Sequence, residues 1–266
     1  MLSAEQRMEF ESRGVVRLAS AVSPQLAGAL RERVLAFIAE HALVPDSPLP
    51  GFTVSASKTA PIWKALGFEE VWGADVIAIV DELLGREAWH LPKQAGQLLA
   101  MSFPLRGVRW DVPTKVWHLD YMAPGAARAI PGVQVFLCLD EIAPGAGGTL
   151  VAAGVHRFID AIRLRAGPAW PGHSADVRNA LQREIPWVRA LGTPRTGEDR
   201  IARFMEAPTS AKAGALQVVE MTGEPGDVWV MHPWMLHAPA PNCGSRPRMA
   251  LTERIRAKGA LGQNRY

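Results

Sequence analysis

Val116-Trp117-His118-Leu119-Asp120-Tyr121 is the stretch of this 266-residue chain on which the interpretation of its fold depends. Its β-branched and aromatic residues are typical of a short strand. Residues two apart on a strand point to the same face, so His118 and Asp120 could both reach one metal ion. A His-x-Asp pair arises by chance in roughly a quarter of chains of this composition, so it needs support from elsewhere in the sequence.

A second imidazole could come from the segment 226–242, which contains His232 and His237. Arg248 follows His237 by eleven residues across a turn rich in Pro, Asn and Gly, so an antiparallel neighbour could return it to the same interior. A buried guanidinium there would suit a carboxylate partner. This spacing favours His237 as the third ligand and leaves His232 as a supporting or structural residue. Three of the remaining histidines are interpreted as surface or packing residues: His41, His90 and His173. His156 belongs to a block, 153–157, that the family resemblance given below treats as a structural turn.

Composition argues against several classes of protein. The 29 Lys and Arg nearly balance the 26 Asp and Glu, and no basic stripe indicates nucleic-acid binding. Cys138 and Cys243 form no Cys-x-x-Cys pattern, so neither a disulfide framework nor a thiolate zinc cluster is expected. The N-terminus lacks the features of a secretory signal, and no apolar run is long enough to span a bilayer. We therefore expect a cytoplasmic protein without a membrane partner, either a monomer or a homodimer.

The apolar pattern predicts helices first and short strands afterwards. Two amphipathic helices are expected over 24–43 and 68–84, the second ending at Gly85, with a loop over 44–61 between them. Strand-like runs are separated by Pro and Gly: 14–18, 88–91, 97–103, 115–121, 133–139, 149–152, 215–220, 227–232 and 248–256. This order favours an antiparallel sandwich or barrel that carries helices on one face.

The segment 155–214 interrupts the strand pattern. It is rich in arginine and has apolar residues at helical spacing, so one or two helices are expected in it. Within a single domain over 1–266, an insertion of this length is typical of a lid or a substrate-binding region. The alternative is a solvated decoration of the surface.

Four blocks of the sequence together resemble the phytanoyl-CoA dioxygenase-like family of iron(II)/2-oxoglutarate-dependent oxygenases. The first two blocks are 13–18 with the following Ser23-Pro24 helix start, and Trp117-His118-Leu119-Asp120. The other two are Gly147-Gly148-Thr149-Leu150 with 154–157, and Gly226-Asp227 with His237, Asn242 and 246–248. The chain departs from the family at Ala153 and Val155 in a turn. It also departs at Pro239, where a hydroxyl residue often assists the co-substrate.

The resemblance implies a mainly β fold with flanking helices, an α+β arrangement around a double-stranded β-helix, or jelly-roll, core. It implies that His118, Asp120 and His237 form an Fe(II) site, because two imidazoles and one carboxylate are a ligand set that suits non-haem iron. The far carboxylate of 2-oxoglutarate would pair with Arg248. Three further contacts to 2-oxoglutarate are expected, although each could be ordinary core: Thr149, Gln97 and Phe136. Dioxygen would be the other co-substrate, and ascorbate is a candidate reductant.

The implied reaction is hydroxylation of an unactivated C–H bond of a small metabolite, with decarboxylation of 2-oxoglutarate to succinate and carbon dioxide. Asp120 argues against halogenation, because halogenating relatives have a small residue in its place. Desaturation, another oxidation, or nucleic-acid demethylation would use the same cofactors. A cupin-like isomerase or binding protein, or an inactive family member, would keep the fold without this chemistry. Arg248 and the intact His-Asp-His set argue against both.

The substrate is expected to be small and partly apolar. Contacts with it are expected from Trp117, Tyr121, Trp234 and Arg163. Other tryptophans could line the same cavity, and other arginines could bind an acidic group: Trp63, Trp72, Trp110, Trp229, Arg106 and Arg109. Tryptophan is highly buried on average in folded proteins, so a core position is the alternative for each of these rings.

Overall fold

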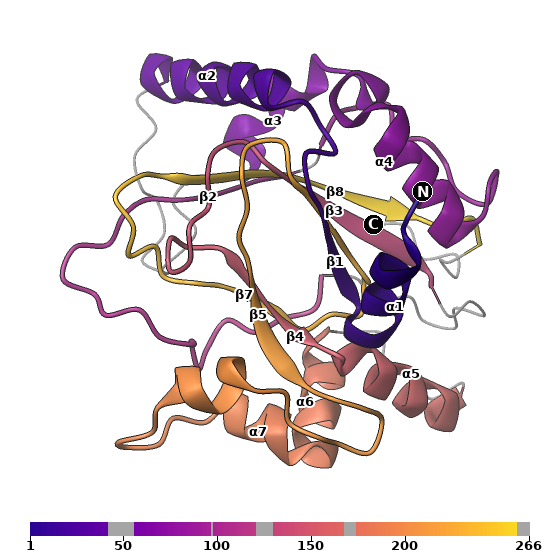
Figure 1. The fold of residues 1–266 in the computed structure, drawn as a ribbon, viewed down its shortest axis with the longest axis vertical. Helices are drawn as coiled ribbons and strands as arrows, with labels where there is room; N and C mark the ends of the chain where they lie inside the picture. The colour runs from indigo at the N-terminus through magenta and orange to yellow at the C-terminus, as the bar shows by residue number, and fades with distance from the viewer. Residues whose placement is uncertain (42–55, 97, 121–129, 168–173, 260–266) are drawn as a thin grey trace.

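The computed structural model describes residues 1–41, 56–96, 98–120, 130–167 and 174–259. Within these ranges, two antiparallel sheets lie at the centre of the molecule, and helices cover the outer side of each sheet (Figure 1). Gln97 and Tyr121, which were expected at the site, lie outside the described residues. Of the helices in the described ranges, none has the length and apolar character needed to cross a bilayer.

The larger sheet has the strand order β1-β6-β3-β8-β2, and every neighbouring pair is antiparallel. Its strands are β1 (Val15–Leu18), β2 (Leu98–Ser102), β3 (Gly132–Cys138), β6 (Val228–Met231) and β8 (Arg248–Arg256). Strand β3 is buried along its whole length, as its unbroken apolar run predicts. The register of β3 with β8 pairs Gln134 with Arg254 and Phe136 with Thr252.

The smaller sheet has the order β5-β4-β7, with β4 (Thr149–Ala153), β5 (Gln217–Met221) and β7 (His237–Pro239). An isolated antiparallel bridge between His118 and His237 continues this sheet beyond β7. The fold class is therefore confirmed as α+β with antiparallel sheets, and the two facing sheets are consistent with a jelly-roll core.

Helices pack on both outer faces of the sheets rather than on one face, so that part of the prediction was wrong. The larger sheet packs against α2 (Pro24–Glu40), α3 (Ala56–Lys64) and α4 (Phe68–Leu84), with Trp63 and Trp72 buried between them. The smaller sheet packs against α5 (Val155–Ala166), α6 (Ser174–Glu184) and α7 (Pro186–Leu191), with the π-helical turn η2 (Ala202–Glu206) nearby. A separate apolar cluster, including Phe136, Val151 and Met231, fills the space between the sheets.

Two helices were not predicted from the sequence. Helix α1 (Ala4–Arg13) begins with a capping box, in which the Gln6 backbone N–H donates to Ser3 Oγ at 3.1 Å. Helix α3 overlaps the loop expected over 44–61, and the loop prediction is wrong from residue 56 onward. Burial of Ile62 and Trp63 in α3 outweighs the loop-like composition of this stretch.

Four smaller predictions also need correction. The strand expected over 88–91 is only a bridge between Trp89 and Ala257. Within the described residues, the strand expected over 115–121 is likewise only the bridge between His118 and His237, because the φ of 62° at Val116 interrupts the extended backbone. The segment 155–214 contains α5, α6, α7 and η2, which is more helix than the one or two helices expected. The helix expected over 24–43 ends at Glu40, and residues 42–43 lie outside the described residues.

Candidate metal centre

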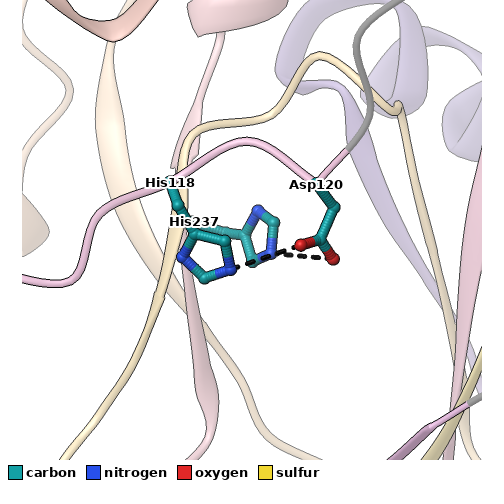
Figure 2. Close-up of side chains that lie close together, drawn as sticks. All are labelled: His118, Asp120 and His237. Atoms are coloured by element: carbon teal, nitrogen blue, oxygen red, sulfur yellow. Dashed lines mark ion pairs between the residues drawn. The ribbon is translucent and has the colours of Figure 1, made fainter. Parts of the chain in front are cut away.

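Two histidines face each other at the edge of the smaller sheet, and an aspartate lies against both (Figure 2). The His118 and His237 backbones exchange hydrogen bonds of 2.9 and 3.0 Å, and their ring centroids are 4.2 Å apart. Asp120 Oδ1 lies 3.4 Å from His118 Nε2, and Asp120 Oδ2 lies 3.4 Å from His237 Nε2. The candidate ligand atoms lie within 4.8 Å of one another, so they could hold a single metal ion.

Both imidazoles are oriented by the carbonyl two residues earlier in the chain. His118 Nδ1 lies 2.8 Å from the Val116 carbonyl oxygen, and His237 Nδ1 lies 3.0 Å from the Met235 carbonyl oxygen. A carbonyl can only accept, so each Nδ1 donates to its carbonyl, and each Nε2 faces Asp120 as the atom that could ligate a metal in place of a proton. Val116 adopts a φ of 62°, which is strained for a β-branched residue and is of the kind often found at functional sites.

Asp120 also contacts two side chains of the larger sheet that were not predicted from the sequence. Arg254 Nη2 lies 2.7 Å from Asp120 Oδ2, and Gln134 Nε2 donates to the same oxygen at 3.2 Å. Burial alone would raise the pKa of Asp120, but hydrogen bonds from His118 and His237 and the charge of Arg254 hold that pKa well below its usual range. The carboxylate is therefore anionic at neutral pH.

The electrostatics of His118 follow from the same contacts. Burial alone would lower the pKa of His118, but the Asp120 carboxylate and the Val116 carbonyl outweigh burial and raise that pKa. A metal ion at this site would therefore compete with a proton for Nε2.

Arg248 lies in the same cavity as the histidines and the aspartate. The cavity has a volume of about 100 Å³, and its walls include Thr149, Phe136 and Pro239. Arg248 Nη2 donates to Thr149 Oγ1, while Arg248 Nε is buried without a hydrogen-bond partner among the described residues. Burial lowers the pKa of Arg248 to about 10, which leaves it cationic at neutral pH.

No carboxylate within the described ranges forms an ion pair with Arg248. Glu220, whose charge acts on Arg248, instead accepts hydrogen bonds from the backbone N–H groups of Gly145 and Gly148 at 2.9 and 3.0 Å. A buried cation without a counterion is costly unless an anion binds to it. This end of the cavity is therefore suited to an acidic ligand.

The structure does not bring the described residues expected to contact substrate to this cavity. Trp117 and Trp234 are buried in the cluster between the smaller sheet and α5–α7, on the opposite face from His118 and His237. Arg163 lies over the Trp234 ring at 5.3 Å and pairs with Asp160. Trp117 instead donates its indole N–H to the Pro113 carbonyl at 2.7 Å, Trp234 lies in the turn before β7, and Arg163 lies on α5.

The other aromatic and basic candidates lie elsewhere too. Trp63 and Trp72 belong to the core under the larger sheet, and Trp229 belongs to the cluster between the sheets. Trp110 packs against the cluster below the smaller sheet, and Arg106 and Arg109 are exposed. His232 also lies outside the cluster of ligand atoms, because its Nδ1 accepts from the Trp234 backbone N–H at 3.1 Å.

The donor set fits a non-haem iron centre. Two neutral imidazoles and one carboxylate, with the remaining positions open, are typical of iron(II) sites that bind a chelating co-substrate. The unpaired Arg248 in the same cavity fits the far carboxylate of 2-oxoglutarate.

Comparison with known protein families agrees with this geometry: residues 10–250 match the family described as phytanoyl-CoA dioxygenase (PhyH). The chain belongs to the phytanoyl-CoA dioxygenase family. The resemblance drawn from the four sequence blocks is thereby confirmed. Family membership, together with the His-Asp-His set, supports Fe(II) and 2-oxoglutarate as cofactors. No curated protein gives a significant sequence match.

Solved structures with a similar fold include EvdO2 from Micromonospora carbonacea var. aurantiaca complexed with 2-oxoglutarate. It has 18% identity and a TM-score of 0.54, and the match covers 100% of this phytanoyl-CoA dioxygenase family chain and 95% of EvdO2. EctD from S. alaskensis, with 2-oxoglutarate and 5-hydroxyectoine, has 17% identity and a TM-score of 0.55 over 96% of this chain and 76% of EctD. SnoK, a carbocyclase from nogalamycin biosynthesis, has 12% identity and a TM-score of 0.52 over 96% of this chain and 84% of SnoK. At these identities the likeness supports a shared fold.

Proposed function

We propose that this protein is an Fe(II)/2-oxoglutarate-dependent dioxygenase that hydroxylates an unactivated C–H bond of a small metabolite. The observation that carries the proposal is the single cavity that joins two different binding groups. One group is the set of His118, Asp120 and His237, and the other is the unpaired cation of Arg248. A metal ligand set alone would suit many proteins, but a metal that shares its cavity with an unmatched buried cation suits a chelating dicarboxylate co-substrate.

Each residue of the cavity has a distinct role in this proposal. His118, Asp120 and His237 hold the iron, and the carbonyls behind the two imidazoles keep their Nε2 atoms aimed at it. Arg248 pairs with the far carboxylate of 2-oxoglutarate, and Thr149 orients the guanidinium. When bound, iron and 2-oxoglutarate supply the oxidising chemistry, in which decarboxylation to succinate drives oxidation of the substrate.

The walls of the cavity explain how the chain could exclude water from the reaction. Phe136 and Pro239 contribute apolar surface to the wall of the cavity that holds both binding groups. Because Pro239 has no hydroxyl and no N–H, it cannot assist the far carboxylate as a hydroxyl residue often does in the family. In this chain that carboxylate depends on Arg248 and Thr149.

The segment 155–214 is proposed to support the site and to contribute to substrate binding or closure. Ser174 Oγ, at the start of α6, accepts a hydrogen bond of 3.2 Å from the backbone N–H of Leu119. Arg178 of α6 donates to the Trp117 carbonyl at 3.3 Å. These contacts connect α6 to the stretch that carries His118 and Asp120, so a movement of α6 would shift the positions of these two candidate ligands.

The proposal is tested with anaerobic protein, Fe(II) and 2-oxoglutarate. A weak visible charge-transfer band is expected when both bind, and its absence would contradict the cofactor assignment. Aerobic succinate release is then measured across a library of small, partly apolar metabolites. Products are analysed by mass spectrometry for gain of one oxygen atom, which indicates hydroxylation, or loss of two hydrogen atoms, which indicates desaturation or ring closure. Succinate release that does not rise above its substrate-free level with any compound would argue against the proposed substrate class.

A further inference from the structure

The two oxygens of the Asp120 carboxylate have unequal surroundings. Oδ2 lies 2.7 Å from Arg254 Nη2 and 3.2 Å from Gln134 Nε2, so it accepts from two side chains of the larger sheet. Within the described part of the chain, the side-chain contact to Oδ1 is limited to His118 Nε2 at 3.4 Å. Oδ2 also lies 3.4 Å from His237 Nε2, so each oxygen faces one nitrogen that would ligate a metal. The difference between the oxygens is the pair of donors, Arg254 and Gln134, that hold Oδ2.

The donors that hold Oδ2 are fixed by the register of two central strands. Gln134 and Arg254 are direct cross-strand partners in β3 and β8. Gln134 Nε2 also lies 3.1 Å from Thr252 Oγ1, the residue two positions before Arg254. The side-chain amide is thereby oriented with its NH₂ towards Asp120, and both donors come from strands rather than loops. Strands hold side chains more precisely than loops do, so this pair can set the position of a carboxylate.

We propose that Arg254 and Gln134 are positioning residues that occupy Oδ2 and leave Oδ1 alone to bind the metal. This inference rests on the proposed function. An iron held by these three residues would also have to bind 2-oxoglutarate and oxygen, and a second oxygen of Asp120 on the iron would compete with them. Occupying Oδ2 with protein donors prevents this.

A purely electrostatic effect of Arg254 predicts the opposite result. A guanidinium close to a divalent cation repels it, so removing that charge alone should strengthen metal binding. Loss of a positioning residue should weaken metal binding instead, because partners of metal ligands typically contribute about 10–100-fold in affinity. The direction of the change therefore distinguishes the two roles.

The experiment uses Co(II) as the probe and measures binding to the apoprotein by calorimetry and by visible absorption, whose band positions report the coordination number. The variants are Arg254→Ala, Arg254→Lys and Gln134→Met; the last removes a donor without changing charge. Arg256→Ala is the matched control, since this exposed arginine is two residues further along β8. Thermal unfolding of each apoprotein checks that it is folded.

The expected result is a loss of Co(II) affinity of about 10–100-fold in Arg254→Ala, with altered absorption bands. A smaller loss is expected in Gln134→Met, partial recovery in Arg254→Lys, and wild-type binding in Arg256→Ala. If Arg254→Ala does not fold, Gln134→Met carries the test by itself. Unchanged or tighter Co(II) binding with unchanged bands in the folded variants would overturn the positioning role and leave the proposed function intact. Failure of the wild-type protein to bind Co(II) would overturn both.

Discussion

Two arginines of strand β8, Arg248 and Arg254, lie six residues apart and therefore on the same face of the strand. Arg254 has a partner in its own chain, because its guanidinium lies 2.7 Å from the Asp120 carboxylate. Arg248 is more deeply buried, yet it pairs with no carboxylate among the described residues and donates to the Thr149 hydroxyl instead.

Arg254 thus forms a complete ion pair within the described residues, whereas Arg248 does not. At the Arg254 end, the chain supplies both charges, and the anion it holds is itself a candidate metal ligand. At the Arg248 end, the part of the chain that the structure describes supplies only the cation, and burial makes an uncompensated charge costly. The comparison therefore indicates where an external dicarboxylate would place its far end, and it makes the two ends of the cavity separately testable.

The largest effect is expected from removing a ligand at the metal end. His237→Ala should abolish the visible band formed with Fe(II) and 2-oxoglutarate. It should also reduce succinate formation. Loss of a residue that hydrogen-bonds to a metal ligand typically costs about 10–100-fold, and loss of a ligand itself should cost more. His41→Ala serves as the control, because His41 is exposed at the end of α2. Persistence of the band in His237→Ala would mean that another residue, such as His232, is the ligand.

The next largest effect is expected at the Arg248 end and should have two opposite parts. Arg248→Met should raise the 2-oxoglutarate requirement by the equivalent of about 2–5 kcal/mol, because the far carboxylate loses a buried charged partner. The same variant should leave the apoprotein equally or more stable, since it removes an unpaired buried charge. A titration with 2-oxoglutarate and chemical denaturation of the apoprotein measure the two parts. Arg246→Met, at a paired surface arginine, is the control; an unchanged requirement in Arg248→Met would mean that another cation anchors the co-substrate.

Glu253 lies between the two arginines in the sequence of β8. Alternation along the strand directs its side chain to the opposite face of the sheet. A change at Glu253 should therefore alter the stability of the fold rather than the binding of metal or 2-oxoglutarate. Burial raises the pKa of Glu253 to about 7, above the value of 4.5 for an unperturbed carboxyl. The folded state therefore binds the proton more tightly, and stability falls as pH rises from about 4.5 to about 7. Glu253→Gln should raise the free energy of unfolding above pH 7 by up to about 3 kcal/mol and have little effect at pH 4. Denaturation at both pH values, with 2-oxoglutarate and Co(II) titrations as controls, checks this; an equal gain at both values would contradict it.

The smallest effects should come from two threonines of the cavity wall, one beside Arg248 and one beside Gln134. Thr149→Val removes the hydroxyl that orients Arg248 and should raise the 2-oxoglutarate requirement by the equivalent of about 1–2 kcal/mol. Thr252→Val removes the hydroxyl beside Gln134 and should weaken Co(II) binding by a similar or smaller amount. Each variant is the control for the other. If both variants change the same binding constant, the two ends are coupled and the comparison fails.

Much of the fold was predictable from local patterns. The apolar run of β3 and the amphipathic helices α2 and α4 follow the periodicity of buried strands and helices. Helix α1 was predictable as well, because Ser3 and Gln6 form a capping signal that was not used. Helix α3 was not predictable in this way, since the burial of Ile62 and Trp63 against the rest of the fold stabilises it against its composition.

Some residues of the candidate site could likewise be predicted from the sequence, and others could not. The His-x-Asp pair, His237 and Arg248 could be predicted from spacing and from family resemblance. Arg254 could have been suggested by its even spacing from Arg248. Trp117 could have been rejected, because in the strand expected over 115–121 it directly precedes His118 and would point to the opposite face. Its burial with the smaller sheet's outer cluster agrees with that rule.

The sequence by itself determined which residues can act: the spacing of His118 and Asp120 predicts that both reach one ion, and alternation along β8 places Arg248 and Arg254 on one face. Only the tertiary structure decided which of these groups meet. The contact of Asp120 with Arg254 crosses 134 positions of chain and depends on the register of β3 with β8, which local spacing does not encode. The same holds for Arg248, because the absence of a partner for a charge can be recognised only after its surroundings are packed.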